Sequence, residues 1–599
     1  MNPSSPRPAK SFAKRFAACK VFQISGKNSV SKSNSLAIYA VPDRNPGLAP
    51  GFGCFRLGGM PHEPCDFILR DGTLYDGSGE APVLGDLAIR GELIAGIGEV
   101  EGTAKVEIDA SGLAIAPGFV NPMCWANESL IADGDSQSDI RQGITLEVMG
   151  EGWSMGPLTD ELKRYQRNRQ GSIRYDIEWT TLDEYLEWLA GRGVSPNIAS
   201  FVGAGLIRAH VLGFDDRRAS PDELKSMRDL VRQAMAEGAL GVSAALIYMP
   251  GLFADTEELI ALASAAAEYD GIYMTHLRSE GTTFLEALEE FFTIIRESGA
   301  RGEIYHLKAA GPDNWHKMTE AIKRIEAERA KGLPVTADMY PYAASATGLD
   351  AIMPPWALDG GHDAWVRRLK DPDVRRRLIR ELSRTGEDGT DLNIEPRSPG
   401  NVLLVDFKTD ALKPLTGKTL AEVANLRGTG PLETAFDLIV EDNSRVGTIY
   451  FTMSEDNVRG QVALPWVSFC TDSASVAPEG VFLESNPHPR AYGSFPRVLA
   501  KYVRDEKVIS LEEAVRRMAA LPCQVLRIRN RGQLRAGWFA DVVAFDPVRI
   551  RDHATFVDPH QYATGIRHVF VNGRPVLRDG EHTGAKPGRV IRGPGAVKV

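Results

Sequence analysis

The stretches Gly-Ile-Tyr-Met-Thr-His-Leu-Arg (271–278) and Glu-Ile-Tyr-His-Leu-Lys-Ala-Ala-Gly (303–311) each place a histidine, His276 and His306, at the end of a short apolar run. Residues 282–299 between them have the spacing of an amphipathic helix, so the pattern predicts strand, helix, strand. Because parallel strands in such a unit end at the same edge, the two imidazoles should meet there. A single histidine of this kind is more often a core residue, but the matched pair favours a site for a metal such as zinc.

Similar apolar runs alternate with helical patterns through the middle of the chain. Eight strands separated by helices indicate an α/β fold, a closed parallel (β/α)8 TIM-type barrel. The stretch from about 345 to 445 is too long for a loop and predicts an inserted lid subdomain. The predicted strands are 115–120, 144–149, 198–202, 240–244, 273–276, 304–306, 335–339 and 467–470.

Both ends of the chain have a different texture, with short strands and tight turns. Asp71-Gly72 and Asn572-Gly573 are typical of hairpin turns. We therefore expect one small β-sandwich domain built from residues 60–115 and 530–599, with the barrel occupying residues 116–529.

Residues 1–59 differ from the rest of the chain. They contain nine Lys or Arg residues and a single acid, Asp43, and are rich in Ser, Pro and Gly. The composition fits an organelle-type targeting segment or a disordered tail. We favour the tail, because Met60 opens the region that carries the first strands.

The bulk composition excludes several classes of protein. The 599 residues are 43% hydrophobic and 25% charged with a net charge of −10, so a general basic surface for nucleic acid is not expected. No apolar run is long enough to span a bilayer. The six cysteines have no paired spacing, which indicates a reducing compartment and a cytoplasmic location.

Polar residues that could do chemistry follow the predicted strands, where active sites of such barrels lie. Two imidazoles, a carboxylate and an open fourth position are typical of a catalytic zinc site. A nearby aspartate can act as general base on the water bound to the metal. Besides His276 and His306, the strand-end candidates are Glu151, Asp338, Tyr340, Tyr342 and Asp472.

The chain from about residue 65 onward resembles the amidohydrolase superfamily and, within it, the N-acyl-D-amino-acid deacylases (D-aminoacylases). The resemblance implies the (β/α)8 barrel with a small β-sandwich. Its carriers are Ala-Pro-Gly-Phe (116–119), Gly-Ala-Leu-Gly-Val-Ser (238–243), Thr-His-Leu-Arg-Ser-Glu-Gly (275–281), His-Leu-Lys-Ala-Ala-Gly (306–311), Tyr-Pro-Tyr (340–342), Thr-Asp-Ser (471–473) and His-Pro-Arg-Ala-Tyr-Gly-Ser-Phe-Pro-Arg (488–497).

The resemblance also implies roles for individual residues. His276 and His306 match the metal-binding histidines of strands five and six, and Asp472 matches the aspartate that takes the proton of the attacking water. Lys308, Tyr340 and Arg490 match positions near the substrate, and the planar guanidinium of Arg490 suits a substrate carboxylate. A surface ion pair is an equally good interpretation of Lys308, and we assign Tyr342 to the core.

The chain departs from the superfamily pattern in two places. Where strand one usually ends in His-x-His, it has Met123 and Trp125, and neither is a plausible zinc ligand. Cys124 between them should face away from the mouth, because successive strand side chains point to opposite faces. Where D-aminoacylases carry a cysteine ligand after strand two, this chain has Glu151, which is either the replacement ligand or a loop acid.

The sequence therefore predicts a metal-dependent amide hydrolase with one zinc ion per chain, held by Glu151, His276 and His306. Its substrate would be a small N-acylated amino acid, of the D series as the resemblance implies, with neither nucleic acid nor membrane as a partner. A dipeptidase or a cyclic-amide hydrolase remains an alternative with the same chemistry. A further alternative is a non-catalytic barrel that lost its second metal site.

Overall fold

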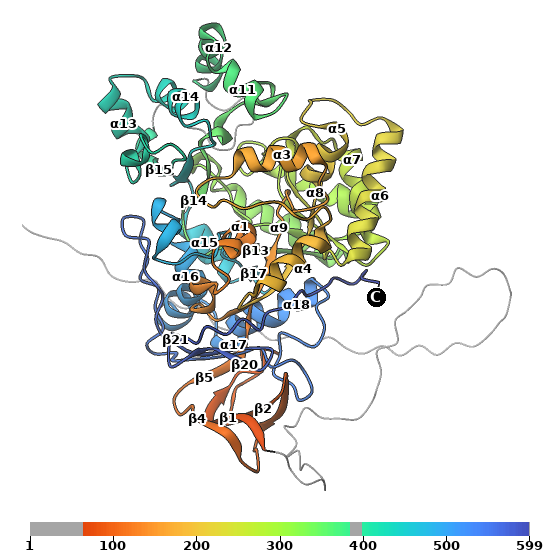
Figure 1. Cartoon of the computed structure of the whole chain (residues 1–599), viewed down its shortest axis with the longest axis vertical. Coiled ribbons are helices and arrows are strands. Elements are labelled where there is room, and N and C mark those ends of the chain that lie inside the picture. Colours follow the sequence, from red (N-terminus) through yellow and green to blue (C-terminus); the bar gives the residue numbers. More distant parts are fainter. Residues whose placement is uncertain (1–63, 384–397, 598–599) are drawn as a thin grey trace, which may run out of the picture. The chain divides into compact units, whose positions relative to one another are not determined.

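The computed structural model describes residues 64–383 and 398–597, so the predicted tail at 1–59 lies outside the described residues. Parallel strands form the centre of the molecule, with helices between them (Figure 1). One six-stranded sheet has the order β17-β13-β12-β11-β10-β9, and a three-stranded sheet has the order β6-β7-β8. These strands are β6 (Phe119–Asn121), β7 (Ile144–Met149), β8 (Asn197–Ser200), β9 (Val202–Gly203), β10 (Gly241–Ala245), β11 (Ile272–His276), β12 (Arg301–Ile304), β13 (Val335–Met339) and β17 (Val467–Phe469).

The two parallel sheets follow one another in the order expected for a barrel. β8 and β9 are consecutive pieces of one stretch, interrupted at Phe201. On the other side, two backbone hydrogen bonds connect the segments after β6 and β17: Asp472 N–H donates to the Met123 carbonyl at 3.1 Å and Trp125 N–H to the Ser473 carbonyl at 2.9 Å. The carboxyl ends of all these strands therefore face the same side.

Helices cover the strands on the outside. The predicted helix at 282–299 is α8, which ends before Gly299 in the left-handed conformation that glycine favours. The helix that follows Ser220 has the expected capping box with Glu223. The helices of this layer are α1 (Ala126–Ala132), α2 (Gln137–Ile140), α3 (Asp160–Arg169), α4 (Leu182–Arg192), α5 (Ala204–Leu212), α6 (Pro221–Glu237), α7 (Thr256–Ala267), α8 (Phe284–Ser298), α9 (Lys317–Ala330), α15 (Glu455–Val462), α16 (Arg490–Arg497), α17 (Leu511–Val515) and α18 (Leu521–Val525).

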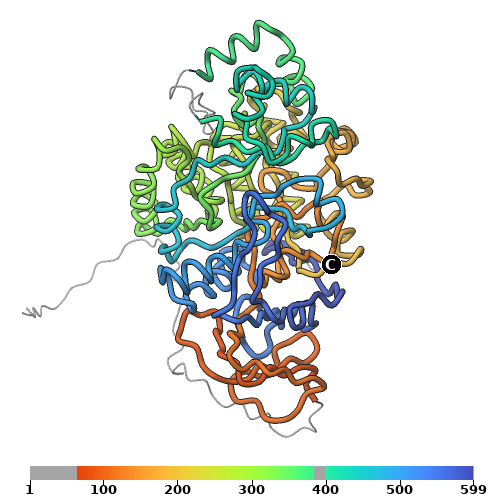
Figure 2. The backbone as a smooth tube through the Cα atoms, turned by 90° about the vertical axis from the view of Figure 1, so that its left-hand side faces the viewer, coloured from red at the N-terminus to blue at the C-terminus, as the bar shows by residue number. Residues whose placement is uncertain are grey.

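Both chain ends meet in one nine-stranded sheet with the order β21-β20-β19-β18-β5-β1-β2-β3, in which β4 also pairs with β1 (Figure 2). The sheet folds over its own core, because the rings of Phe67 on β1 and Phe570 on β19 lie 5.2 Å apart although two strands separate β1 from β19 in the order. Its strands are β1 (Cys65–Leu74), β2 (Val83–Arg90), β3 (Leu93–Gly98), β4 (Ala104–Asp109), β5 (Ala114–Pro117), β18 (Val542–Phe545), β19 (Ile566–Val571), β20 (Arg574–Arg578) and β21 (Glu581–His582).

The two predicted hairpin turns had different outcomes. Asn572-Gly573 does join β19 and β20, with the positive φ values that a two-residue turn needs. The prediction for Asp71-Gly72 was wrong, because β1 continues through both residues. Its register to β2 shifts there, as in a β-bulge, and Asp71 has φ +56°.

Two predicted strands of the barrel also had the wrong bounds. The predicted strand 115–120 is divided at Gly118 between β5 of the terminal sheet and β6 of the parallel strands. A Cβ on Gly118 would lie 2.2 Å from the Thr145 hydroxyl, so the chain passes Thr145 too closely for any side chain. The predicted strand 304–306 begins earlier, as β12, and ends at Ile304.

The predicted insert at about 345–445 has secondary structure of its own, and residues 384–397 of it lie outside the described residues. It contains an antiparallel sheet of order β14-β16-β15 and a separate hydrophobic core that includes Trp365, Leu404 and Phe436. The elements are β14 (Ser345–Gly348), α10 (Pro355–Leu358), α11 (His362–Arg368), α12 (Pro372–Leu382), β15 (Val402–Asp406), α13 (Leu420–Arg427), α14 (Pro431–Asp442) and β16 (Gly447–Tyr450).

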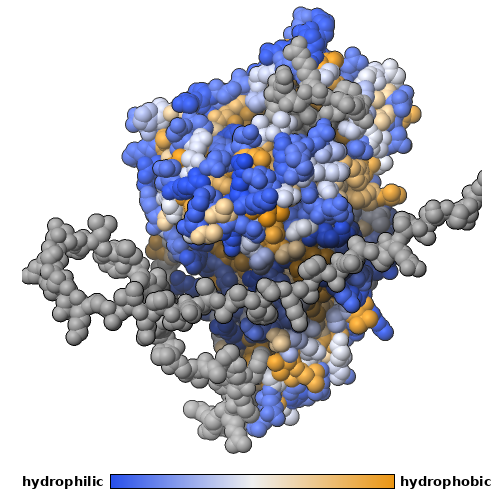
Figure 3. Space-filling view, turned by 180° about the vertical axis from the view of Figure 1, so that it is seen from behind, coloured by the Kyte–Doolittle hydropathy of each residue, from blue (hydrophilic) through white to orange (hydrophobic). Residues whose placement is uncertain are grey.

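The described surface is mostly polar. Figure 3 shows one face on which hydrophobic side chains are scattered among hydrophilic ones. Large exposed apolar residues such as Leu84, Leu426 and Val557 come from separate segments. None of the described helices is both long and apolar enough to cross a membrane.

Candidate active site at the carboxyl ends of the parallel strands

A cavity of about 510 Å³ lies where the parallel strands end. All the side chains predicted as site residues line it, although they come from distant parts of the chain. They are Glu151, His276, His306, Lys308, Tyr340, Asp472 and Arg490. Each of them is at most 6% exposed, so the site is withdrawn from bulk water.

Glu151 reaches this cavity because of the glycines on either side of it. Gly150 and Gly152 have φ of +100° and +60°, which L side chains rarely adopt. A Cβ on Gly150 would lie 2.7 Å from the Phe201 carbonyl oxygen, and one on Gly152 2.6 Å from the Cβ of Ala245. The loop after β7 is therefore packed tightly against β9 and β10, with the Glu151 carboxyl turned into the cavity.

His306 is held in an unusual backbone conformation just after β12. Its φ is +33°, and its backbone N–H donates to Asp338 Oδ1 of β13 at 2.6 Å. A non-glycine residue with positive φ costs free energy and persists only where the surroundings enforce it. Asp338, predicted only as a strand-end carboxylate, thus orients His306 through the backbone.

The two histidines meet as the sequence predicted. His276 is the last residue of β11, and its ring centroid lies 4.5 Å from that of His306 at an interplanar angle of 80°. His276 Nδ1 lies 2.9 Å from the Leu277 carbonyl oxygen, a hydrogen bond that leaves Nε2 as the nitrogen that could bind a metal ion. The Glu280 carboxylate lies between the rings, 3.5 Å from His276 Nε2 and 3.2 Å from His306 Nδ1.

The potential metal ligands form two overlapping groups, each with its ligand atoms within 4.8 Å of one another. One group is His276, Glu280 and His306; the other is Glu151, His306 and Asp472. His306 belongs to both, and its Nε2 lies 3.2 Å from Glu151 Oε1. The predicted ligands Glu151 and His276 therefore fall in different groups, bridged by His306.

The electrostatics of the cluster favour a cation. Burial raises the pKa of Glu151 and lowers that of His276 to about 3. Burial and Lys308 alone would lower the pKa of His306, but the carboxylates of Asp472, Glu151 and Glu280 raise it to about 10. Carboxylates that attract a proton to an imidazole attract a metal ion for the same reason, and imidazole with carboxylate is a donor set that suits zinc.

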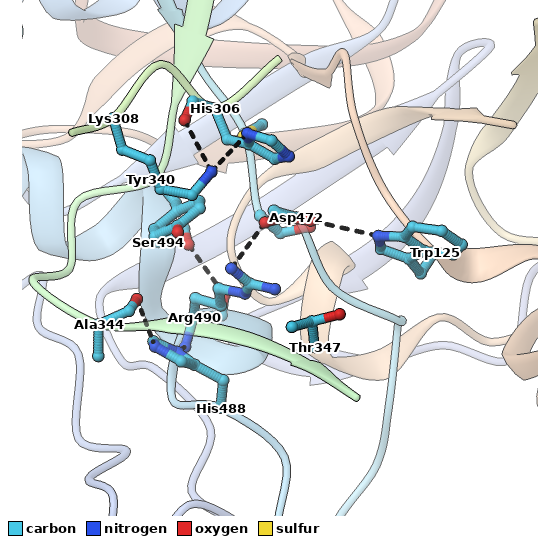
Figure 4. A network of polar contacts seen from close by, with 12 residues as sticks. Trp125, His306, Lys308, Tyr340, Ala344, Thr347, Asp472, His488, Arg490 and Ser494 are labelled. Carbon is cyan, nitrogen blue, oxygen red and sulfur yellow. Dashed lines mark hydrogen bonds and ion pairs between the residues drawn. The ribbon is translucent and has the colours of Figure 1, made fainter. Parts of the chain in front are cut away.

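Asp472 lies beside this cluster with both carboxylate oxygens engaged (Figure 4). The Trp125 indole N–H donates to Oδ1 at 3.2 Å, and Arg490 Nη1 lies 2.7 Å from Oδ2. Asp472 has φ +47°, a conformation that aspartate and asparagine tolerate better than most residues. Trp125, at one of the two strand-one positions where the resemblance implies a metal-binding histidine, contacts the predicted general base instead.

The predicted substrate-binding residues form one group around Tyr340. The Arg490 guanidinium lies 4.5 Å and the Lys308 ammonium 5.8 Å from the centroid of the Tyr340 ring. Lys308 is not in a surface ion pair: it is 5% exposed and donates to Glu280 Oε1 at 2.6 Å. Within the part of the chain that the structure describes, Arg490 Nε has no hydrogen-bond partner, so it remains available to a ligand.

Cys124 and Tyr342 lie outside the donor groups. The Cys124 thiol donates to the Val148 carbonyl at 3.2 Å, and burial raises its pKa well above the ordinary value. Tyr342 is 4% exposed and packs against Arg497 and His488, as expected for a core residue.

Sequence reasoning missed Glu280. It lies within the segment 275–281 that carries the family resemblance, four residues after His276, in a loop whose direction no strand pattern reveals. It contacts His276, His306 and Lys308, and these neighbours hold its pKa below the ordinary value although burial acts in the opposite direction.

Comparisons with known proteins agree with this architecture. A model of the amidohydrolase family matches residues 106–577. D-aminoacylase from Alcaligenes xylosoxydans xylosoxydans is 34% identical over 88% of this chain and 98% of its own length. A solved N-acyl-D-glutamate deacylase from Bordetella bronchiseptica, in complex with zinc and a phosphonate that mimics the tetrahedral intermediate, is 29% identical with a TM-score of 0.73 over 88% of this chain and its own full length.

A third relative bears on metal content. A D-aminoacylase structure with a TM-score of 0.72 and 30% identity, covering 88% of this chain and all of its own, is described as activated by one metal and attenuated by a second. With the fold and the strand-end donors in place, these similarities define the class of protein: the chain belongs to the amidohydrolase family. Within that family it is similar to the D-aminoacylases.

Proposed function

We propose that this chain is a metal-dependent hydrolase that removes the acyl group from N-acyl-D-amino acids. The observation that carries the proposal is the position of His306, which shares one ligand group with His276 and Glu280 and another with Glu151 and Asp472. The amidohydrolase relatives act on N-acyl-D-amino acids, which supports the same reaction and the D configuration here. The parallel strands would close into one (β/α)8 barrel around this site.

The metal would be a single zinc ion, held by Glu151, His276 and His306, with Glu280 within reach of both imidazoles. When bound, such an ion polarises a carbonyl group and lowers the pKa of a water molecule. Met123 and Trp125 offer no donors for a second ion, which fits an enzyme that needs one.

Asp472 moves the proton in this scheme. It takes a proton from the attacking water as the new C–O bond forms, and it returns the proton to the nitrogen as the C–N bond breaks. Trp125 and Arg490 restrict the carboxylate from either side, so it would need little reorientation during the reaction. The products are a carboxylic acid and a free amine.

Arg490 would bind the substrate carboxylate. Its Nη1 already faces Asp472, and Nε is free for a second acceptor. Lys308 and Tyr340 add a positive charge and a ring surface next to it. A buried guanidinium with an unused donor is a strong site for a carboxylate, since leaving that donor unpaired costs free energy.

A cytoplasmic location is part of the proposal. The described cysteines, Cys65, Cys124, Cys470 and Cys523, are free and buried, as is usual where thiols stay reduced.

A metal count combined with an amine-release screen tests the function. Purified full-length protein should contain close to one zinc per chain and release amine from N-acetyl-D-amino acids but not from their L enantiomers. Release only from dipeptides or from cyclic amides would replace the proposal with the corresponding hydrolase. Protein that binds metal but releases no amine from any of these would indicate a non-catalytic barrel.

A further inference from the structure

A second cavity, of about 380 Å³, adjoins the active-site cavity at Glu151; we call it the annex. The two cavities share the wall residues Trp125, Glu128, Glu151, Arg169, Tyr248 and Arg445. The annex alone is lined by Trp153, Met155, Tyr165, Tyr175 and Met249. Of the residues just named, only Glu151 and Trp125 have a role in the hydrolysis proposed above.

The annex and the group of Lys308, Tyr340 and Arg490 lie at the ends of different parallel strands. Most residues of the annex follow β6, β7 or β10 or belong to α3 and the segment after it, and Asp350 and Arg445 come from the insert. Lys308, Tyr340 and Arg490 follow β12 and β13 or begin α16, and they line only the main cavity. Glu151, a predicted metal ligand, lies at the boundary between the two regions.

This arrangement determines which part of a substrate can enter the annex. The reacting carbonyl carbon carries two substituents: the nitrogen, which leads to the amino acid and its carboxylate, and the acyl chain. With the carboxylate on Arg490, the amino acid occupies the side of β12, β13 and β17. The acyl chain must then extend past Glu151 toward β7 and β10.

We propose, on the basis of the deacylase function proposed above, that the annex binds the acyl substituent and selects a large apolar one, such as a medium-length fatty acyl chain or an aryl acyl group. An acetyl methyl group is about the size of a water molecule, about 30 Å³, and would leave most of the annex empty. Aromatic and thioether side chains supply apolar contact at a small entropic cost.

Packing holds the aromatic walls in place. The Tyr165 ring lies 4.6 Å from Phe214 and 6.1 Å from Trp153, and Tyr175 stacks on Trp179 at 6.0 Å. These rings therefore form a preorganised surface, which strengthens binding because little order is lost when the ligand enters.

Several charged and hydroxyl groups of the annex have partners, whereas the amide oxygens Asn127 Oδ1 and Gln166 Oε1 have none among the described residues. The Tyr175 hydroxyl donates to Glu128 Oε1 at 2.5 Å, and burial raises the pKa of Glu128. Arg445 pairs with Asp350 at 2.9 Å. Arg169 lies over the Tyr165 ring, 5.5 Å from its centroid, at the shared wall. A negatively charged acyl group could bind Arg169 in place of its contact with the Tyr165 ring.

The first measurement uses full-length protein loaded with zinc and one D-amino acid carrying acetyl, butanoyl, hexanoyl or octanoyl groups. The value of kcat/KM should rise about fourfold for each added methylene until the annex is filled, the usual gain for burying a methylene group. If the acetyl compound is hydrolysed but kcat/KM does not rise, or falls, with longer acyl chains, the proposed role of the annex is wrong while the deacylase function stands. Failure with every chain length would overturn the function itself.

A variant of Tyr165 then tests whether the acyl chain of the substrate binds in the annex. Tyr165→Ala should lower the octanoyl-to-acetyl ratio of kcat/KM about eightfold, the change expected if about 50 Å² of apolar contact is lost. Tyr165→Phe keeps the ring and should preserve the ratio. A ratio unchanged in Tyr165→Ala, or a change in preference among D-amino acid side chains instead, would place the acyl chain elsewhere. A preference for N-glutaryl over N-pentanoyl substrates would assign the annex to an anionic acyl group at Arg169.

Discussion

At the scale of single residues, the site depends on side chains that are held by strained or crowded backbone. His306 and Asp472 both have positive φ, and Glu151 lies between two glycines that no other residue could replace without a clash. Such positions are common at active sites because the surrounding fold enforces them. Replacing the side chain of His306, Asp472 or Glu151 should therefore affect chemistry more than folding, whereas any side chain at Gly150 or Gly152 would disturb the loop.

Asp472→Asn tests the proton acceptor. We expect kcat to fall by about two orders of magnitude or more, the usual scale for the loss of a general base. Asparagine tolerates the positive φ of this position, so the loop should keep its shape and the metal content should stay near one per chain. Steady-state kinetics and metal analysis on the same sample check both points, and full activity would remove Asp472 from the mechanism.

Glu151→Ala tests the third metal ligand. The variant should lose zinc and activity together, because Glu151 is the donor that joins His306 from the loop after β7. Cys124→Ser is the matched control and should retain both, since the Cys124 thiol contacts the Val148 carbonyl. Loss of zinc in the cysteine variant but not in the glutamate variant would reverse the assignment. If Glu151→Ala retains zinc, Glu280 is the carboxylate ligand.

At the scale of elements, β12 and β13 carry a pair of buried carboxyl groups beneath the site. Burial and the neighbouring Asp338 raise the pKa of Glu303 to about 8, and burial raises the pKa of Asp338 to about 7. Thr336 of β13 and Ser468 of β17 each donate a hydrogen bond to the Glu303 carboxyl group. The pair connects the strands that position His306 and Asp472.

The raised pKa values of Glu303 and Asp338 predict how the stability of the folded protein depends on pH. In the unfolded chain these carboxyls lose their protons near their ordinary pKa, whereas the folded protein retains them to higher pH. The folded state therefore binds more protons, and the free energy of unfolding should decrease as the pH rises from about 5 to 8, by on the order of 2 kcal/mol. Glu303→Gln should flatten this decrease. Tm measured from pH 5 to 9 for both proteins checks it, and identical slopes would contradict the prediction.

At the scale of the whole molecule, the long-range contacts are the ones that build the site. Trp125 and Asp472 are far apart in sequence yet joined by one hydrogen bond, and the terminal sheet pairs β5 with β18 from opposite ends of the chain. Folding of the parallel strands and of the terminal sheet should therefore be strongly coupled.

Residues 1–59 provide a prediction at this scale that rests on their composition and on where the first described strand begins. A protein that starts at Met60 should be soluble and should keep its metal content and amine-release activity, because the first described strand, β1, begins at Cys65. Thermal unfolding and activity of the shortened and full-length proteins compare the two directly. An insoluble shortened protein beside a folded full-length one would show that residues 1–59 take part in the structure.

Much of this protein could be predicted from its sequence because the signals are local. The apolar runs at 144–149 and 335–339 coincide with β7 and β13, and the capping box at Ser220 starts α6. The side chains predicted as metal-binding, catalytic or substrate-binding line one cavity, whereas the strand-end candidates Asp338 and Tyr342 do not. Buried parallel strands appear in the sequence as continuous apolar segments, and their carboxyl ends lie at one edge of the sheet. The position of a side chain that follows such a segment can therefore be predicted from the neighbouring residues in the sequence.

Tertiary structure alone decided the features that depend on a distant partner. Gly118 divides a single apolar run between two sheets because Thr145 passes next to it, and Asp71-Gly72 forms a bulge rather than a turn because β2 pairs on both sides of it. Glu280 joins the histidines, and Trp125 holds Asp472, through loops whose direction is determined by contacts with other strands. The energy of such contacts arises between segments far apart in sequence, so no local pattern records it.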